Sequence, residues 1–247
     1  MPDPEKLTAV RAALPAVSAG IYLNTGSVGP MPAETAAAMA EIADYERDLG
    51  RAHPDYFVES LARMDEARAS VAAVLGADVG AVALTHSTTD AMNIATLLPD
   101  WRQGGRTVTT AHEHPGGVGP LYALRDRSGV DITFVDAGAD GDDDRTIAAF
   151  EEAITPETRL VSISHVLWTT GAVMPVAKIV EIAHDRGAVV AVDGAQAAGA
   201  LPFRFDELGA DLYAVSAQKW LLGPEGMGAL VATRSAIERA IPTTDGR

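Results

Sequence analysis

The sequence predicts an α/β fold of three layers (α/β/α), in which helices cover both faces of a mainly parallel, seven-stranded sheet. Two observations lead to this prediction. From about residue 80 onward, short apolar runs alternate with amphipathic helical stretches, which is the pattern of repeated strand–helix–strand units. Most of these runs are also too apolar to leave one face in water, as expected for strands that are covered on both sides.

The predicted elements follow one another along the chain. A short helix is expected over 4–14, then a brief extended pair at Tyr22 and Leu23, and then a segment rich in glycine and proline that excludes regular structure up to Pro32. Apolar residues at helical spacing predict helices over 33–49 and 55–75, the second ending at Gly76. The expected strands are 81–84, 107–109, 132–135, 160–163, 188–192, 212–215 and 228–231. The expected helices between them are 88–98, 116–127, 145–154 and 175–186.

Length and composition limit the classes of function. The 247 residues are interpreted as an N-terminal segment (1–30) followed by one large domain (31–247). The net charge of −15 disfavours nucleic acid or an anionic membrane as a partner, because either would repel the chain. The absence of cysteine excludes disulfides, thiolate metal sites and a catalytic cysteine within these residues. With no targeting signal and no apolar run near the roughly 18 residues of a membrane span, we expect a soluble, cytoplasmic protein.

Polar side chains gather where the predicted strands end, which is the edge at which open α/β sheets bind ligands. The hydroxyl-rich segment 85–93 either caps the following helix or binds a phosphate at its N-terminus. The segment 111–117 contains two histidines and a glutamate, which suit a metal ion, a stacked aromatic ligand or an ordinary loop. Hydroxyl and aromatic residues gather again in 164–171.

Two charged residues follow strands that are otherwise apolar. Asp193 ends the run 188–192, and a buried carboxylate there needs a cationic partner, such as an arginine elsewhere or a ligand. Lys219 follows the run 212–215, and a lysine in a partly desolvated pocket becomes a neutral amine that attacks aldehydes. Together with a phosphate site and a stacking imidazole, these residues predict a planar aromatic aldehyde with a ring nitrogen and a phosphate. Pyridoxal phosphate has these features.

The runs VDGAQAAG and SAQKWLLGPEGMG resemble the class V aminotransferase family of fold-type-I pyridoxal-phosphate enzymes. This family includes cysteine desulfurases, C–S lyases and isopenicillin-N-epimerase-like proteins. The resemblance extends from LNTGSVGPMP to the end of the chain, and THSTTDAMN and HEHPGG support it. Where desulfurases carry an asparagine-rich segment, this chain has LWTT at 167–170, which is closer to the epimerase-like branch.

The resemblance implies a role for each matching residue. Lys219 corresponds to the lysine that bonds to the cofactor aldehyde and later moves the proton of the substrate α-carbon. Asp193 corresponds to the partner of the ring nitrogen, Gln196 to the donor to the phenolic oxygen, and His114 to the aromatic group stacked on the ring. The implied phosphate contacts are Thr88, Thr89, Ser216 and Gln218. The loop that approaches the substrate carboxylate in relatives corresponds to Asn24, Gly26 and Ser27.

These observations predict a pyridoxal-phosphate enzyme that acts on an amino acid and is desulfurase-like or C–S-lyase-like. An aminotransferase or epimerase on the same scaffold is the alternative. A shortened, non-catalytic cofactor-binding chain is a further one, because the small C-terminal domain of relatives is expected to be absent. A nicotinamide-binding domain is disfavoured because no G-x-G-x-x-G joins a strand to a helix. The resemblance also implies a homodimer, and no metal ion is expected.

Overall fold

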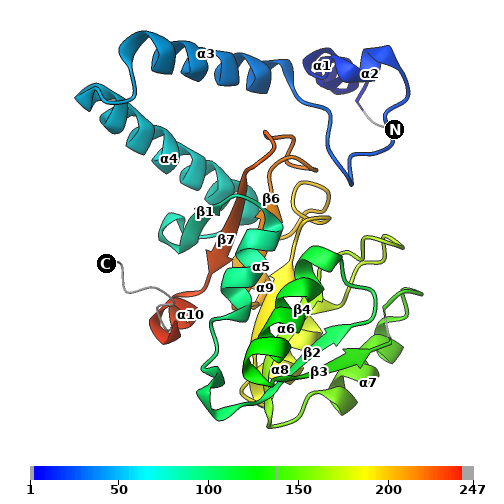
Figure 1. Cartoon of the computed structure of the whole chain (residues 1–247). Helices are drawn as coiled ribbons and strands as arrows, with labels where there is room; N and C mark the ends of the chain where they lie inside the picture. The colour runs from blue at the N-terminus through cyan, green and yellow to red at the C-terminus, as the bar shows by residue number, and fades with distance from the viewer. Residues whose placement is uncertain (1–2, 137, 241–247) are drawn as a thin grey trace.

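A computed structural model of the chain describes residues 3–136 and 138–240. Its centre is a seven-stranded sheet in the order β1-β7-β6-β5-β4-β2-β3 (Figure 1). Strand β7 runs antiparallel to β1 and β6, and the remaining pairs are parallel, which confirms the mainly parallel sheet. The strands are β1 (Val82–Thr85), β2 (Arg106–Thr110), β3 (Asp131–Val135), β4 (Thr158–Ser164), β5 (Val189–Asp193), β6 (Leu212–Ser216) and β7 (Gly228–Ala232).

Each strand and helix predicted from 30 onward lies within two residues of an observed one, as does the first helix. The sequence missed only short elements, and the pair Tyr22 and Leu23, which was expected to be extended, forms no strand of the sheet. The helices are α1 (Pro4–Ala13), α2 (Ala16–Ala19), α3 (Ala33–Leu49), α4 (Pro54–Leu75), α5 (Thr88–Thr96), α6 (Pro115–Ser128), α7 (Asp143–Ala153), α8 (Val176–Asp185), α9 (Phe205–Leu208) and α10 (Arg234–Arg239). Two single 3₁₀ turns are η1 (Val79–Ala81) and η2 (Trp101–Gln103).

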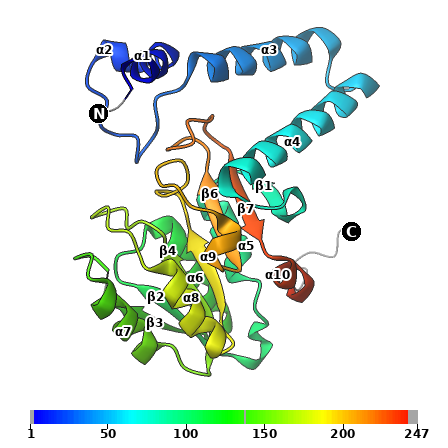
Figure 2. The ribbon, with the colours of Figure 1, turned by 180° about the vertical axis from the view of Figure 1, so that it is seen from behind.

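Two apolar cores sandwich the sheet and confirm the three layers. Successive side chains of a strand point to opposite faces, so Val190 and Val192 of β5 pack towards α7 and α8, whereas Val189 and Ala191 pack towards α5 and α6. Figure 1 shows α5 and α6 in front of the sheet, and Figure 2 shows α8 and α9 on the opposite face. Each fully buried valine contributes about 1.5–3 kcal/mol relative to an exposed one.

Two parts of the chain are more exposed than the sequence predicts. Strand β3 is an edge strand, and Phe134 on it is 43 % exposed. Helices α3 and α4 form an arm that extends away from the sheet (Figure 1). Only Ala72 and Leu75, at the inner end of α4, are buried in this arm. Apolar spacing therefore identified both helices correctly but did not reveal that their apolar side is uncovered. No helix in the described part of the chain is long and apolar enough to cross a lipid bilayer.

The boundary predicted between an N-terminal segment (1–30) and a large domain (31–247) stays a prediction, and residues 241–247 lie outside the described residues. Gly76 ends α4 as expected, in a left-handed conformation with φ of 64° that glycine adopts without steric cost.

A buried histidine lies directly beyond the end of β4. The His165 ring is in hydrogen-bond contact with the Tyr213 hydroxyl (Nδ1 to Oη, 2.8 Å) and packs against Phe203. Burial lowers the pKa of His165 to about 4, because the charged imidazolium loses its hydration.

His165 should therefore make the ligand-free protein less stable in acid. The unfolded chain takes up a proton near the ordinary pKa of about 6.5, whereas the folded protein resists it down to about 4. The free energy of unfolding that this group contributes is therefore complete above about pH 6.5. It is lost as the pH falls from about 6.5 to about 4, by on the order of 3 kcal/mol. In urea unfolding between pH 7 and 4, His165→Gln should show a flatter decline than the wild type. His86→Gln, at an exposed histidine, should leave the decline unchanged, and parallel curves for all three proteins would contradict the prediction.

Candidate active site

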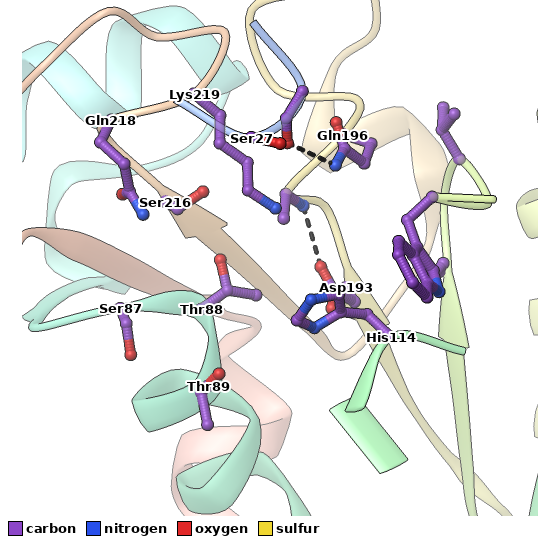
Figure 3. Close-up of a pocket in the computed structure, with 15 residues that line it drawn as sticks. Ser27, Ser87, Thr88, Thr89, His114, Asp193, Gln196, Ser216, Gln218 and Lys219 are labelled. Atoms are coloured by element: carbon purple, nitrogen blue, oxygen red, sulfur yellow. Dashed lines mark hydrogen bonds between the residues drawn. The ribbon is translucent and has the colours of Figure 1, made fainter. Parts of the chain in front are cut away.

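A cavity of about 360 Å³ opens at the carboxyl ends of the parallel strands (Figure 3). Asn24 is the one residue of the predicted site that does not line it; its carbonyl instead accepts hydrogen bonds from the N–H groups of Ser27 (3.0 Å) and Val28 (3.2 Å). Asn24 thus shapes the turn that brings its neighbours to the cavity. The predicted residues that line the cavity are Gly26, Ser27, Thr88, Thr89, His114, Asp193, Gln196, Ser216, Gln218 and Lys219.

Asp193 lies on the floor of the cavity as the last residue of β5. Its place is fixed by the sheet register, which pairs it with Ser164 of β4 and Ala214 of β6. Its Oδ1 accepts a hydrogen bond from the N–H of Ala195 at 2.9 Å. Burial raises the pKa of Asp193, while Lys219 and, more weakly, the His114 side chain oppose the rise. Among the described residues, no arginine pairs with Asp193, so the arginine partner that the sequence left open is not found there, and the nearby cation is Lys219.

Lys219 lies in the tight turn that follows β6, and its ammonium group points towards Asp193 (Figure 3). Burial lowers the pKa of Lys219, and the charge of Asp193 only partly opposes this. The turn is closed by hydrogen bonds from Leu222 N–H to the Lys219 carbonyl (3.2 Å) and from Gly223 N–H to the Ala217 carbonyl (2.8 Å). The lowered pKa makes the neutral, nucleophilic form of the amine easier to reach, and the turn holds that amine in place.

Unpaired hydroxyl groups mark the opposite end of the cavity. Ser87 caps α5 by accepting a hydrogen bond from the N–H of Asp90 at 3.0 Å, so the capping interpretation is correct for Ser87. Thr88 and Thr89 then begin the helix, where backbone N–H groups have no intrahelical partner. The hydroxyls of Thr88 and Ser216 and the amide oxygen of Gln218 are buried without a hydrogen-bond partner. Because buried polar groups are nearly always paired, this end fits a polar ligand such as a phosphate.

The His114 ring faces the cavity from the turn before α6. Its Nδ1 accepts a hydrogen bond from the N–H of Gly116 at 3.0 Å, and the ring meets Trp168 edge to face at 5.3 Å. Burial and the nearby Lys219 lower the pKa of His114, so a neutral ring is favoured there. His112 instead points to Asp136 (3.3 Å), and no group of three or more potential metal ligands occurs among the described residues. The loop therefore suits stacking better than metal binding.

The N-terminal loop is tied to the lysine turn. The N–H of Gly29 donates to the carbonyl of Gln218 at 2.6 Å, and a Cβ on Gly29 would lie 2.2 Å from the Lys219 carbonyl. The amide of Gln196 donates to the carbonyl of Gly26 (2.8 Å) and accepts from the indole N–H of Trp220 (2.8 Å). Only glycine permits the first approach, and Gln196 retains one amide hydrogen for a ligand.

Further cavity residues were not predicted as site residues. Two of them could have been found from the sequence, because Ser164 ends a predicted strand and Trp168 follows it closely. Ser87 lies in the hydroxyl-rich segment 85–93 that the sequence had singled out, whereas the positions of Val166 and Ala195 depend on the fold around them. The additional lining residues are Ser87, Ser164, Val166, Trp168 and Ala195.

Curated relatives share most of this chain but extend well beyond its length. A probable cysteine desulfurase of Methanothermobacter thermautotrophicus is 33 % identical over 90 % of this chain and 55 % of its own. The isopenicillin N epimerase of Streptomyces clavuligerus is 32 % identical over 90 % of this chain and 56 % of its own. The chain thus spans little more than half the length of these two relatives.

Two solved structures also match nearly all of this chain while extending well beyond its length. C-DES, a cystine C–S lyase captured with its reaction product cysteine persulfide, superposes with a TM-score of 0.88 at 30 % identity, covering 93 % of this chain and 61 % of that one. A lysine-to-alanine mutant of C-DES, with glycine covalently linked to its PLP cofactor, superposes with a TM-score of 0.90 at 29 % identity, covering 98 % and 62 %. These matches confirm the predicted fold. The family model described as aminotransferase class-V matches residues 21–246, and the chain belongs to this family.

Proposed function

We propose that this chain binds pyridoxal phosphate and cleaves a C–S bond in a small sulfur-containing amino acid. The observation that carries the proposal is one cavity that joins a partly desolvated amine, a buried carboxylate and unpaired hydroxyls. Few ligands other than an aromatic aldehyde with a ring nitrogen and a phosphate would use all three.

The cavity residues divide the chemistry between them. Bound pyridoxal phosphate supplies an electron sink for a carbanion at the substrate α-carbon. Lys219 would hold the cofactor through its Nζ, and the same Nζ, when free, would move the proton at that carbon. Asp193 would face the ring nitrogen and, as a carboxylate, favour its protonated form. His114 would offer its ring as the stacking group, and the free amide hydrogen of Gln196 would be available to the phenolic oxygen.

The remaining predicted residues act at the two ends of the cavity. At the phosphate end, the helix N-terminus at Thr88 and Thr89 offers backbone N–H groups and a positive dipole. The hydroxyl of Ser216 and the amide of Gln218 complete this cradle. At the other end, Gly26 and Ser27 line the mouth that receives the substrate carboxylate, and Asn24 holds their turn through its carbonyl.

The choice of C–S cleavage rests on the solved relatives, whose descriptions include a cystine C–S lyase with its persulfide product. The 247 residues contain no cysteine, so they themselves offer no thiol to accept sulfur. An aminotransferase or epimerase is the alternative, supported by the epimerase relative and by the LWTT segment at 167–170. The expected cytoplasmic location stays a prediction.

We further propose that two copies form a homodimer through the arm of α3 and α4. Apolar side chains on this arm are uncovered, with Phe57, Val58 and Leu61 each more than half exposed. An apolar surface of this kind is typical of an interaction site. Pairing two arms would bury it.

The cofactor should attach to one lysine only. The chain has three lysines, Lys6, Lys178 and Lys219, and Lys178 is an exposed residue paired with Glu181. After incubation with pyridoxal phosphate and borohydride reduction, mass spectrometry should locate the adduct on Lys219. Lys219→Ala should lose the adduct and the visible absorbance, whereas Lys178→Ala should retain both. A colourless wild type, or equal labelling of Lys219→Ala, would refute cofactor binding at this site.

Turnover assays separate the candidate functions. The loaded protein should release sulfide or persulfide from L-cysteine or L-cystine, and Lys219→Ala should be inactive. Amino-group transfer to a keto acid, or exchange of the α-proton with inversion, would instead identify the aminotransferase or the epimerase. Tight cofactor binding without turnover of any amino acid would identify the non-catalytic chain.

Ser216→Ala should weaken the binding of the cofactor without lowering the stability of the protein. It removes a buried hydroxyl that lacks a partner, so the cofactor-free protein should be as stable as the wild type or more stable by about 1 kcal/mol. Cofactor affinity should fall about tenfold, the equivalent of one hydrogen bond to a charged group. Thr109→Val is the matched control, because the Thr109 hydroxyl is also unpaired but lies outside the cavity. Equal affinities for Ser216→Ala and wild type would rule out the phosphate role.

The wild type should elute with about twice the 25.7 kDa mass of the chain in size-exclusion chromatography with light scattering. Leu61→Glu places a charge on the apolar arm and should give monomers. Ile237→Glu is the control, because Ile237 is a similarly exposed residue on α10. A monomeric wild type, or a dimer that resists Leu61→Glu, would contradict the proposed interface.

A further inference from the structure

Glu113 is an enclosed acid to which the proposed chemistry gives no role. It lies in the turn between β2 and α6, one residue before His114. The residue as a whole is partly exposed, but protein atoms surround its carboxyl group, and burial raises its pKa to about 7. No positive charge is among the groups that set this pKa. A carboxyl group held in this way needs hydrogen bonds in place of an ion pair.

Two hydroxyl groups supply those bonds. Thr110 Oγ1–H donates to Oε1 of Glu113 at 2.6 Å, and Ser164 Oγ–H donates to Oε2 at 2.5 Å. The Thr110 oxygen also accepts the N–H of His112 (3.2 Å), so its own hydrogen remains available for Glu113. Thr110 ends β2 and Ser164 ends the neighbouring β4. The carboxyl group therefore bridges the ends of two adjacent strands.

The Glu113 carboxyl group is connected to two residues that would contact the cofactor ring, Asp193 and His114. Ser164 pairs with Asp193 in the sheet, and both residues line the cavity. Asp193 is also close enough to contribute to the raised pKa of Glu113. In the other direction, the peptide bond after Glu113 leads directly to His114, whose ring faces the cavity. One carboxyl group thus connects the floor of the cavity to its stacking residue.

We propose that Glu113 is a positioning residue that sets the gap between the His114 ring and the floor at Asp193, and thereby the fit of a planar ring between them. This inference rests on the proposed binding of pyridoxal phosphate. Glu113 contacts neither the ring nor the substrate, and acts through the two hydroxyl groups and the peptide it shares with His114.

Three variants test this role, with the dissociation constant of pyridoxal phosphate and the visible circular dichroism of the bound cofactor as readouts. Glu113→Ala leaves both hydroxyls without a partner, and should weaken binding at least about tenfold, or 1.4 kcal/mol, and reduce the induced dichroism. Glu113→Gln can bond to both hydroxyls and should stay within about threefold of the wild type. Val108→Ala removes buried apolar atoms from β2, the strand that Thr110 ends. It should lower the stability of the protein while leaving the dichroism of the bound cofactor unchanged.

A double variant tests whether Glu113 acts on cofactor binding through Ser164. Because Glu113 and Ser164 act as one unit, Glu113→Ala combined with Ser164→Ala should bind the cofactor no more weakly than Glu113→Ala alone. Wild-type affinity and dichroism in Glu113→Ala would overturn the inference. So would a loss in Glu113→Gln as large as in Glu113→Ala, or an equal loss of dichroism in Val108→Ala. Failure of the wild type to bind the cofactor would refute the proposed function, and this inference with it.

Discussion

The burial of the Asp193 carboxylate is the constraint on which the cavity depends. An unpaired carboxylate at the end of a covered strand costs several kcal/mol or takes up a proton. The parallel register places it beside the ends of β4 and β6, so the groups that offset its charge come from the segments after the strands. The N–H of Ala195 and the charge of Lys219 both contribute in this way. A second acid, Glu113, lies in the same region, and it is held by hydroxyl groups in place of a cation.

Much of this arrangement follows from local sequence. Runs such as 188–192 and 212–215 are too apolar for anything but covered strands, and the residues that follow such strands must meet at one edge of a parallel sheet. This rule predicts that Asp193 and Lys219 lie in one cavity, although 25 residues lie between them in the sequence. Their chemical types then narrow the ligand, because few small molecules require both a buried carboxylate and a desolvated amine.

Features that depend on distant or external contacts could not be predicted from local sequence. Periodicity shows that α3 and α4 are helices, but it cannot show whether their apolar side meets the sheet or another molecule. The hydrogen bond from Gln196 to the Gly26 carbonyl joins residues 170 positions apart, and no local pattern indicates it. Asn24 was expected to approach the substrate, yet its carbonyl closes a turn. The sequence placed Glu113 among possible metal ligands, and its enclosed hydroxyl contacts emerge only from the packing of β2 against β4.

The order of the sheet also bears on how the chain is made. Strand β1 lies at one edge, and within the described sheet its only neighbour is β7, whose residues follow it by about 145 positions. During synthesis, the four residues of β1 therefore leave the ribosome long before their partner exists, with unsatisfied backbone groups on both sides. An open strand of this kind can pair with other nascent chains. The sheet is joined only when β7 inserts between β6 and β1, so the last strand of the described sheet to be translated is the one that connects β1 to the other strands.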